Sequence, residues 1–409
     1  NRGYEVFRNV IRDTIQKSLE DNKKQNMKLD ILMEVYIDIK MNIVENKEAI
    51  NDFIDCVIEI SDSVNSDNWN GEDVMGIFFN EFNRYKKKSE SGQVFTPDHI
   101  TSLMYKILEV NANDKILDAA CGSGAFLVKS MSNMIKEVGG INTKEAKKIK
   151  EHSLFGIEFD REIFALACAN MMIHKDGKTN LEQLDSRDKE ASEWIKSKGI
   201  TKVLMNPPFE RKYGCKKIVE NVLNSVPSGI KCAFIMPEKK MEKDKMGKLL
   251  EKHHLEAIIK LPEKLFDAGV TTSIYVFKKN KKQVGEIYGC YIEDDGLERV
   301  KNQGRQDIKD KWMELENYWV DSIRKRNDTK YGTSQWIDPK KFLSYQKPKA
   351  EFVLYEEDFV KTMMNYLMFK NKIDVKEFSD KLINKTLYNS EILKEDNNIV
   401  IKIKDAEDE

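Results

Sequence analysis

Apolar and polar positions follow three different patterns along the chain. Residues 1–89 place apolar side chains at helical spacing and contain no proline, which predicts an N-terminal helical domain. From residue 90 to 285, short apolar runs alternate with amphipathic stretches, and this alternation predicts a doubly wound, mostly parallel α/β sheet. Residues 286–409 are mixed and highly charged, and we expect a mainly helical C-terminal extension there.

Short apolar runs in the middle part are expected to be its strands. They are residues 116–117, 154–157, 181–184, 203–205, 233–236, 255–261 and 273–277. Amphipathic stretches between them are expected to be helices, at 125–138, 163–173 and 239–252. Further along the chain, the pattern predicts one more strand at 287–292 and a helix at 312–326.

The stretch from Lys115 to Phe126 predicts a ligand-binding turn. The apolar pair Ile116-Leu117 ends at Asp118, and a small-residue loop leads into a helical pattern. The loop contains Ala119, Cys121, Gly122 and Gly124. A strand, a glycine turn and a helix form the first nucleotide-binding unit of a doubly wound sheet, and glycine lets the backbone approach a ligand closely.

Two sequence motifs are absent from this turn, and their absence narrows the classes of ligand that it could bind. A phosphate loop needs Gly-Lys-Ser/Thr, which this turn lacks, and a dinucleotide fingerprint needs a third glycine where this chain has Leu127. Asp118 places a carboxylate at the carboxyl end of the strand, which suits a ligand with ammonium or hydroxyl groups. S-adenosylmethionine is such a ligand, although the turn alone is also compatible with an unrelated loop.

A second motif, Asn206-Pro207-Pro208-Phe209, follows the apolar run 203–205. The two prolines stiffen the backbone and remove two N–H donors, which leaves carbonyl groups available as acceptors. Asn206 offers an amide oxygen and Phe209 a flat stacking face. This set fits a planar group with an exocyclic amino group. The alternative is a proline-rich turn with a core phenylalanine, and the Asp118 turn upstream favours the functional interpretation.

These two motifs together resemble those of the amino-methylating DNA methyltransferases. The resemblance is strongest to the methylation subunit of type I restriction–modification systems, which makes N6-methyladenine. Two further stretches agree with it: Gly92-Gln-Val-Phe-Thr-Pro-Asp, and Leu261-Pro-Glu-Lys-Leu-Phe followed by Thr271-Thr-Ser-Ile-Tyr-Val-Phe. The likeness covers about residues 90–280, and Ala119 stands where the family usually has proline.

The resemblance implies a catalytic set of Asn206, Pro207, Pro208 and Phe209. The Asn206 side chain and the Pro207 carbonyl would bind N6 of an adenine that is flipped out of the duplex and stacked on Phe209. Methyl transfer from a sulfonium depends on alignment and needs no metal. The cytosine C5 route uses a Pro-Cys nucleophile, and this chain contains no Pro-Cys.

The expected cofactor residues come from several stretches. Glu158 ends the second expected strand, where an acidic residue binds ribose hydroxyls. By resemblance, the backbone of Phe95, Thr96 and Pro97 would cover the methionine end of the cofactor, and Asp185 would accept from the adenine amino group. The full expected set is Phe95, Thr96, Pro97, Asp118, Ala119, Cys121, Gly122, Gly124, Glu158, Phe159 and Asp185, with Asp188 as a rival to Asp185.

The charge balance and the cysteine content of the chain indicate what it can bind and where it is expected to be found. The chain has 68 Lys and Arg against 69 Asp and Glu, a net charge of −1, so any DNA affinity must come from local patches or from a partner. Six scattered cysteines without a Cys-x-x-Cys pair predict neither a disulfide framework nor a zinc site. With no signal peptide and no apolar run of about 18 residues, we expect a cytoplasmic protein.

The resemblance implies duplex DNA as substrate, a separate specificity subunit, and a nuclease or translocase subunit. The two flanking regions would be docking surfaces. Two alternatives stay open at this point. A methyltransferase for protein glutamine or for an RNA base would use the same Asn-Pro-Pro-aromatic motif, and a scaffold subunit would bind cofactor without activity of its own.

Overall fold

The computed structural model divides the chain into two compact units, Asn1–Gln346 and Lys347–Glu409. The structure describes residues 9–10, 13, 47–77, 96–174, 180–209, 214–241, 248–263, 265–266, 270–300, 304–327, 333–348, 354–380, 390–395 and 398–403. The boundary expected near residue 285 falls inside the first unit, because the strand and helix that follow it pack into the same fold. None of the described helices is long and apolar enough to cross a membrane.

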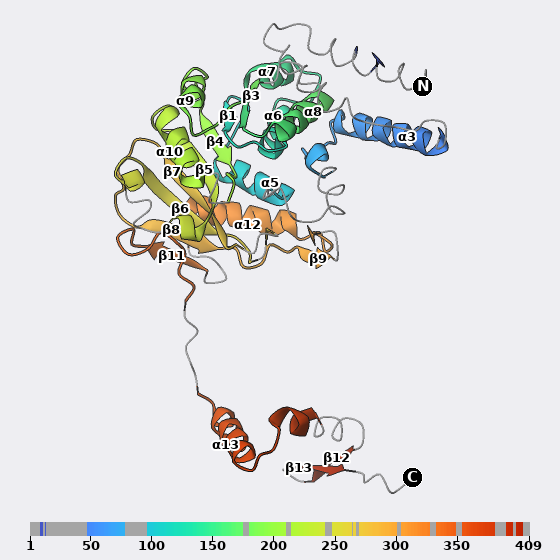
Figure 1. The fold of residues 1–409 in the computed structure, drawn as a ribbon, viewed down its shortest axis with the longest axis vertical. Helices are drawn as coiled ribbons and strands as arrows, with labels where there is room; N and C mark the ends of the chain where they lie inside the picture. Colours follow the sequence, from blue (N-terminus) through green and yellow to red (C-terminus); the bar gives the residue numbers. More distant parts are fainter. Residues whose placement is uncertain are drawn as a thin grey trace. The chain divides into compact units, whose positions relative to one another are not determined.

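The first unit is built on a sheet of nine described strands in the order β11-β8-β6-β7-β5-β4-β1-β2-β3 (Figure 1). The strands are β1 (Ile116–Asp118), β2 (Leu154–Glu158), β3 (Asn180–Gln183), β4 (Lys202–Met205), β5 (Lys231–Pro237), β6 (His254–Lys260), β7 (Thr272–Lys278), β8 (Ile287–Tyr291) and β11 (Ser334–Ile337). Strands β3, β2, β1, β4 and β5 are mutually parallel. The expected mostly parallel α/β sheet is therefore present, extended at one side by β8 and β11.

Strand β7 runs against the direction of both its neighbours. It pairs antiparallel with β5, where Pro237 faces Thr272, and antiparallel with β6, where a bulge lies between Leu255 and Ala257. Because Pro237 ends β5 and Thr272 begins β7, the start of β7 lies at the carboxyl end of the parallel strands.

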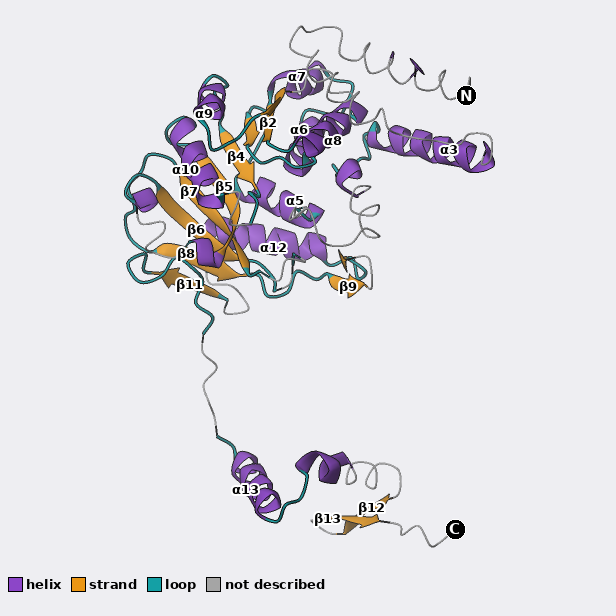
Figure 2. Cartoon of the chain, in the orientation of Figure 1, coloured by secondary structure: helices purple, strands orange, loops and turns teal. Residues whose placement is uncertain are grey.

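Helices cover both faces of this sheet (Figure 2). One core cluster joins strand residues to α5 (Asp98–Ile107), α6 (Ala125–Glu137), α7 (Lys144–His152), α8 (Arg161–Ile173) and α12 (Trp312–Lys325). The other joins them to α9 (Lys189–Lys196) and α10 (Cys215–Ser225). A 3-10 turn, Glu238–Lys240, and a small hairpin, β9 (Glu298–Val300) with β10 (Gly304–Gln306), complete the described elements of this part. Two buried faces explain why the strands are apolar on both sides.

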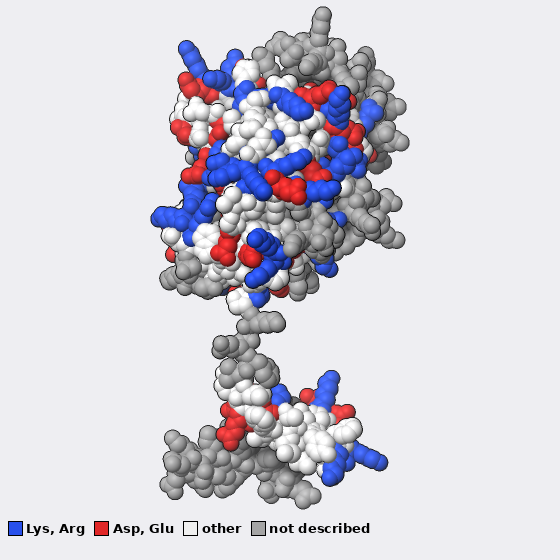
Figure 3. Space-filling view, turned by 90° about the vertical axis from the view of Figure 1, so that its left-hand side faces the viewer, with Lys and Arg blue, Asp and Glu red and all other residues white. Residues whose placement is uncertain are grey.

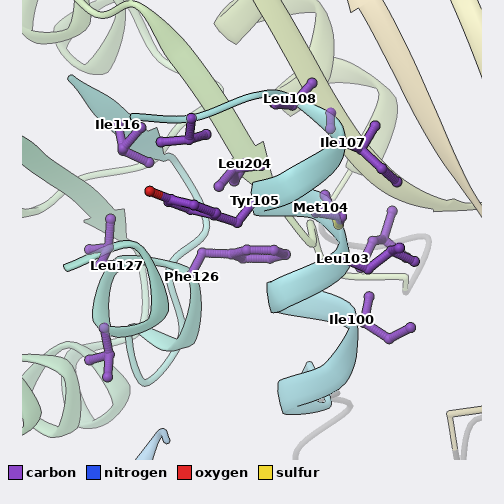
Figure 4. Packing of buried hydrophobic residues seen from close by; sticks show 14 of the residues in the cluster. Ile100, Leu103, Met104, Tyr105, Ile107, Leu108, Ile116, Phe126, Leu127 and Leu204 are labelled. Carbon is purple, nitrogen blue, oxygen red and sulfur yellow. The ribbon is translucent and has the colours of Figure 1, made fainter. Parts of the chain in front are cut away.

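Strand β1 shows how the two clusters are separated. Ile116 belongs to the cluster of α5 and α6, whereas the next residue, Leu117, belongs to the cluster of α9 and α10. Figure 4 shows the first side, where Leu103, Phe126 and Leu204 pack together between helices and strands. Each fully buried side chain of this size contributes about 1.5–3 kcal/mol to stability. The centre of the sheet is therefore a rigid support for the loops that follow its strands.

The described part of the N-terminal region belongs to the same core. Helix α3 (Lys47–Val64) ends in the buried Val64, and the nearby Trp69 is 8% exposed. Both lie in the cluster of α6 and α8, and Trp69 stacks on His174 with ring centroids 4.1 Å apart. Residues 65–77 are therefore packed against the α/β fold, while the division of the chain at residue 89 remains a prediction.

The second unit contains α13 (Glu356–Lys370) and a hairpin of β12 (Ser390–Glu395) and β13 (Asn398–Ile403). Helix α13 has no buried residue within the described chain, although it is rich in apolar side chains. Its exposed apolar residues are Phe359, Val360, Met363, Met364, Tyr366, Leu367 and Phe369. Exposed apolar side chains of this number are typical of an interaction surface.

Candidate active site

A cavity of about 180 Å³ opens at the carboxyl ends of β4, β1 and β2 and beside the residues that follow β3. The chain runs from β1 to β2 and β3 on one side and continues at β4 on the other, so the strand order reverses here. Ligands bind at this reversal in open α/β sheets. The cavity brings together most of the predicted residues, namely Thr96, Asp118, Ala119, Cys121, Gly122, Glu158, Phe159, Asp185, Asn206, Pro207, Pro208 and Phe209.

The glycine turn after β1 is shaped by backbone hydrogen bonds. Gly122 and Gly124 have φ values of +56° and +96°, a left-handed conformation that favours glycine. The Cys121 N–H donates to the Ile157 carbonyl at 3.0 Å, which ties the turn to β2. Burial raises the pKa of the Cys121 thiol well above its ordinary value, so this thiol is a packing group and not a nucleophile.

A third close contact takes the place of the third glycine of the dinucleotide fingerprint. A dinucleotide fingerprint would have glycine at position 127, where α6 has Leu127; here α6 instead approaches Gly156 of β2. A Cβ added at Gly156 would lie 2.4 Å from Leu181 Cδ2, 2.9 Å from Leu127 Cδ1 and 3.1 Å from Cys121 Sγ. Helix α6 thus approaches the sheet closely through a glycine on the neighbouring strand.

Asp118 is 1% exposed and ends β1. Its Oδ1 accepts a hydrogen bond from the Ala120 N–H at 3.1 Å. Burial raises the pKa of Asp118 to about 8, and the neighbouring Glu158 carboxylate adds to that rise, while the Ala120 N–H opposes it. The carboxylate therefore lacks a full set of compensating donors, and a cationic ligand would supply them.

Glu158 at the end of β2 connects the turn to the next helix. Its Oε2 accepts from the Gly122 N–H at 3.0 Å and its Oε1 from the Asp160 N–H at 2.9 Å. Burial raises the pKa of Glu158, and these backbone donors partly offset the effect. A carboxylate has about four acceptor sites, and the backbone N–H groups of Gly122, Phe159 and Asp160 use three of them, so Glu158 can still accept from a ligand hydroxyl group. Asp160 caps α8 by accepting from the N–H groups of Glu162 and Ile163.

Asp185 follows β3 and lines the cavity, whereas Asp188 precedes α9 and is not among the lining residues. Both Asp185 oxygens accept from the Arg187 guanidinium, and the hydrogen bonds from Arg187 lower the Asp185 pKa. Arg187 Cζ lies 5.9 Å from the ring centroid of Phe159, which is 56% exposed. This end of the cavity therefore offers an exposed aromatic face beside an ion pair.

The Asn206-Pro-Pro-Phe209 motif lines the opposite part of the cavity, after β4. Asn206 Nδ2 donates to Thr96 Oγ1 at 2.9 Å, which fixes the amide orientation and leaves its oxygen as the group that can accept from a ligand. Phe209 is 9% exposed and packs edge to face on the buried Phe266, with ring centroids 5.4 Å apart. Phe266 lies in the core.

Two predicted cofactor residues lie outside the cavity lining, and the position of a third is not described. Phe95 falls outside the described residues. Pro97 is the N-cap residue of α5 and Gly124 that of α6, and neither lines the cavity. The cavity also has lining residues that the sequence did not single out: Ala120, Ser123, Ala125, Phe126, Asp160, Ile163, Ser186, Arg187 and Ile218. Ser186 and Arg187 directly follow Asp185. Their position just after an expected strand is the sequence signal that could have identified them as cavity residues.

The doubly wound fold of the first unit has a counterpart among solved structures. A structure at TM-score 0.52 and 18% identity, a modification subunit of a putative type I restriction enzyme from Vibrio vulnificus YJ016, shares it over 66% of this chain and 60% of that one. The family model described as N-6 DNA Methylase matches residues 70–228 and 223–324. The chain belongs to the N-6 DNA methylase family.

Two relatives are similar in sequence. The type II restriction enzyme and methyltransferase RM.BcgI of Heyndrickxia coagulans is 30% identical over 340 residues, which cover 76% of this chain and 51% of that protein. The HindI methylase subunit of Haemophilus influenzae is 23% identical, over 77% of this chain and 73% of that subunit. For the first four curated relatives, the chain spans between 43% and 53% of their length.

Proposed function

We propose that this chain transfers a methyl group from S-adenosylmethionine to N6 of adenine in duplex DNA. The observation that carries the proposal is the convergence of two groups on one cavity. A pair of buried carboxylates, Asp118 and Glu158, lies on one side, and the Asn206-Pro-Pro-Phe209 motif lies on the other. A methyl group can pass from a cofactor to an acceptor only where the residues that bind each of them face the same cavity.

The carboxylate side fits this cofactor. S-adenosylmethionine carries an ammonium group, a sulfonium group and two ribose hydroxyls, and it supplies the methyl group when bound. Asp118 is buried with a raised pKa, which an ammonium group beside it would offset. Glu158 would accept from ribose hydroxyls, and Phe159 would stack on the adenine ring. Asp185 is paired with Arg187, so we propose that this ion pair borders the adenine edge rather than offering a free carboxylate.

The acceptor side supplies alignment. The N6 lone pair of adenine is conjugated with the ring, so it is a poor nucleophile. Hydrogen bonds from N6 to the Asn206 oxygen and the Pro207 carbonyl would favour a tetrahedral nitrogen as positive charge develops. The Asn206 orientation is set before substrate arrives, because Thr96 accepts from its Nδ2. Phe209 would stack on the flipped-out base, and Phe266 supports its ring.

We further propose that DNA specificity comes from a separate subunit, with a nuclease or translocase subunit as an additional partner. The net charge is −1, and on the face seen in Figure 3 basic and acidic side chains intermingle over the larger unit. A protein that holds DNA alone carries a strong positive patch. The exposed apolar side chains of α13 suit protein docking, so we assign residues 286–409 a docking role, with the N-terminal region as a second surface. The cytoplasmic location stays a prediction.

A methyltransferase for protein glutamine or an RNA base remains the competing candidate, because a planar amide presents the same chemistry to Asn206. Membership of the N-6 DNA methylase family favours DNA. Incubating the chain with a specificity subunit, plasmid DNA and labelled cofactor, followed by nucleoside analysis, separates the candidates. N6-methyladenine that disappears in Asn206→Ala supports the proposal. Label that enters protein or RNA but not DNA contradicts it.

A further inference from the structure

A half-buried carboxylate, Asp73, connects the N-terminal region to the glycine turn of the cavity. Asp73 lies just before the helical residues 74–77, and its Oδ1 accepts from the Gly76 N–H at 2.8 Å. Its Oδ2 accepts from the hydroxyl group of Ser123. Ser123 lies in the turn between Gly122 and Gly124 and lines the cavity. One side chain therefore caps a helical turn and holds the ligand-binding loop at the same time.

Asn170 of α8 completes this network. Its Nδ2 donates to Asp73 Oδ1 at 2.7 Å and to the Ser123 carbonyl at 2.9 Å. Asn170 is fully buried and Ser123 is 2% exposed. Three segments far apart in sequence thus meet in one hydrogen-bonded cluster. Its hydrogen bonds are buried or half-buried, and such bonds fix geometry more firmly than exposed ones.

The segment that carries Asp73 is itself held along α6. We call residues 69–76 the bridging segment. Lys129 Nζ donates to the Asn70 carbonyl at 2.6 Å, and Ser132 Oγ donates to the Trp69 carbonyl at 3.1 Å. Gly71, with φ of +80°, approaches so closely that an added Cβ would lie 2.8 Å from Ser132 Cβ. The bridging segment is therefore a fixed support, from which Asp73 can hold the turn in place.

We propose that Asp73 is a positioning residue for cofactor binding, which acts through Ser123 on the conformation of the glycine turn. The proposal rests on the proposed function, since it concerns the affinity for S-adenosylmethionine. A turn with two glycines can adopt many backbone states, and the observed one places the Gly122 N–H on the Glu158 carboxylate and Ser123 in the wall of the cavity. The bridge to Asp73 and Asn170 selects that state before the ligand arrives.

Four variants test the proposal by calorimetric titration with S-adenosylmethionine. Asp73→Ala and Ser123→Ala should each weaken binding about tenfold, the effect of losing one hydrogen bond to a charged group. The double variant should bind no more weakly than Asp73→Ala alone, because Asp73→Ala already removes the hydrogen bond that Ser123→Ala removes. Asp73→Asn keeps a capping oxygen and can donate to Ser123 Oγ, so it should bind nearly as the wild type does.

Gly76→Ala provides a steric test in which the carboxylate is kept. An added Cβ would lie 2.2 Å from Asp73 Oδ2 and 2.9 Å from Ser123 Oγ, so the carboxylate must turn away from Ser123. Alanine favours a helix more than glycine does, so thermal stability should hold while affinity falls. Asp67→Ala is the matched control: Asp67 Oδ1 accepts from the Ile141 N–H at 2.9 Å and is not among the residues that line the cavity, so its loss should leave affinity unchanged.

The outcomes separate two failures. A wild-type chain that does not bind S-adenosylmethionine overturns the proposed function, and the role of Asp73 falls with it. A wild type that binds, with Asp73→Ala, Ser123→Ala and Gly76→Ala equally tight, overturns the role of Asp73 alone. Additive losses in the double variant, or an equal loss in Asp67→Ala, would also overturn it, because either result points to general destabilisation rather than to this bridge.

Discussion

Replacing Asp118 with asparagine should make the chain more stable at neutral pH while it weakens cofactor binding. The side chain is 1% exposed, and burial raises its pKa to about 8. In the unfolded chain an aspartate titrates near 3.9, so between those values the folded state holds one more proton than the unfolded state. The contribution of this group to the free energy of unfolding is therefore greatest at low pH and declines as pH rises toward 8.

The size of the effect follows from the slope of the free energy of unfolding against pH. One proton corresponds to about 1.4 kcal/mol per pH unit, so raising the pH from about 5 to about 7 should cost the wild type about 2–3 kcal/mol that Asp118→Asn does not lose. Urea denaturation of both proteins without cofactor, at both pH values, measures this difference. Asp118→Ala should lose the same pH dependence at a lower absolute stability, because it leaves a cavity.

Proton release on binding provides an independent check. If an ammonium group of the cofactor lies beside Asp118, binding near pH 7 should drive out the proton that the buried carboxyl group holds. Calorimetry in two buffers of different ionisation enthalpy should give about one proton less released by Asp118→Asn than by the wild type. Parallel pH–stability curves for the two proteins, or identical proton release, would refute the reasoning about this carboxylate.

Three further results are expected. Asn206→Ala should lower the rate of methyl transfer by about 10²–10³-fold. Calorimetry should show a nearly unchanged cofactor affinity, because the Asn206 side chain is proposed to bind the methyl acceptor. A comparable loss of cofactor affinity would contradict that role. Phe209→Trp should keep more activity than Phe209→Ala in the methylation assay, because a stacking face survives, and equal losses would remove stacking from the mechanism. Gly156→Ala should lower the free energy of unfolding by about 1–3 kcal/mol in thermal melts, because its Cβ would lie 2.4 Å from Leu181 Cδ2 of β3 and 2.9 Å from Leu127 Cδ1 of α6. An unchanged melting temperature would show that these neighbours can move apart.

The strand pattern predicted the architecture well, because buried parallel strands leave continuous apolar runs. Asp118, Glu158 and Asn206 could be found because each directly follows such a run, and the carboxyl ends of parallel strands share one edge. The division at residue 285 followed a change in composition, but β8 and β11 extend the same sheet. The strand at 287–292 was itself predicted, but an apolar run does not indicate which sheet its strand joins.

The bridge between Asp73 and Ser123 could not be predicted in this way. The two residues lie far apart in sequence, and an aspartate before a short helical stretch looks like an ordinary helix cap. Its second role depends on packing of the bridging segment against α6, which is a tertiary property. The same holds for the Asp185–Arg187 pair, since the sequence gives no sign of which carboxylate is already neutralised by a neighbour.

The reversed direction of β7 has a consequence for how the two halves of the site are supported. Because Thr272 begins β7 at the carboxyl end of β5, the residues that join β6 to β7 return to the edge that carries the cavity, and Phe266 among them supports Phe209. The carboxylates assigned to the cofactor follow β1 and β2 instead. The two halves of the site therefore depend on different connections: a substitution at Phe266 should change the support of the Phe209 ring, while the carboxylates that follow β1 and β2 keep their positions.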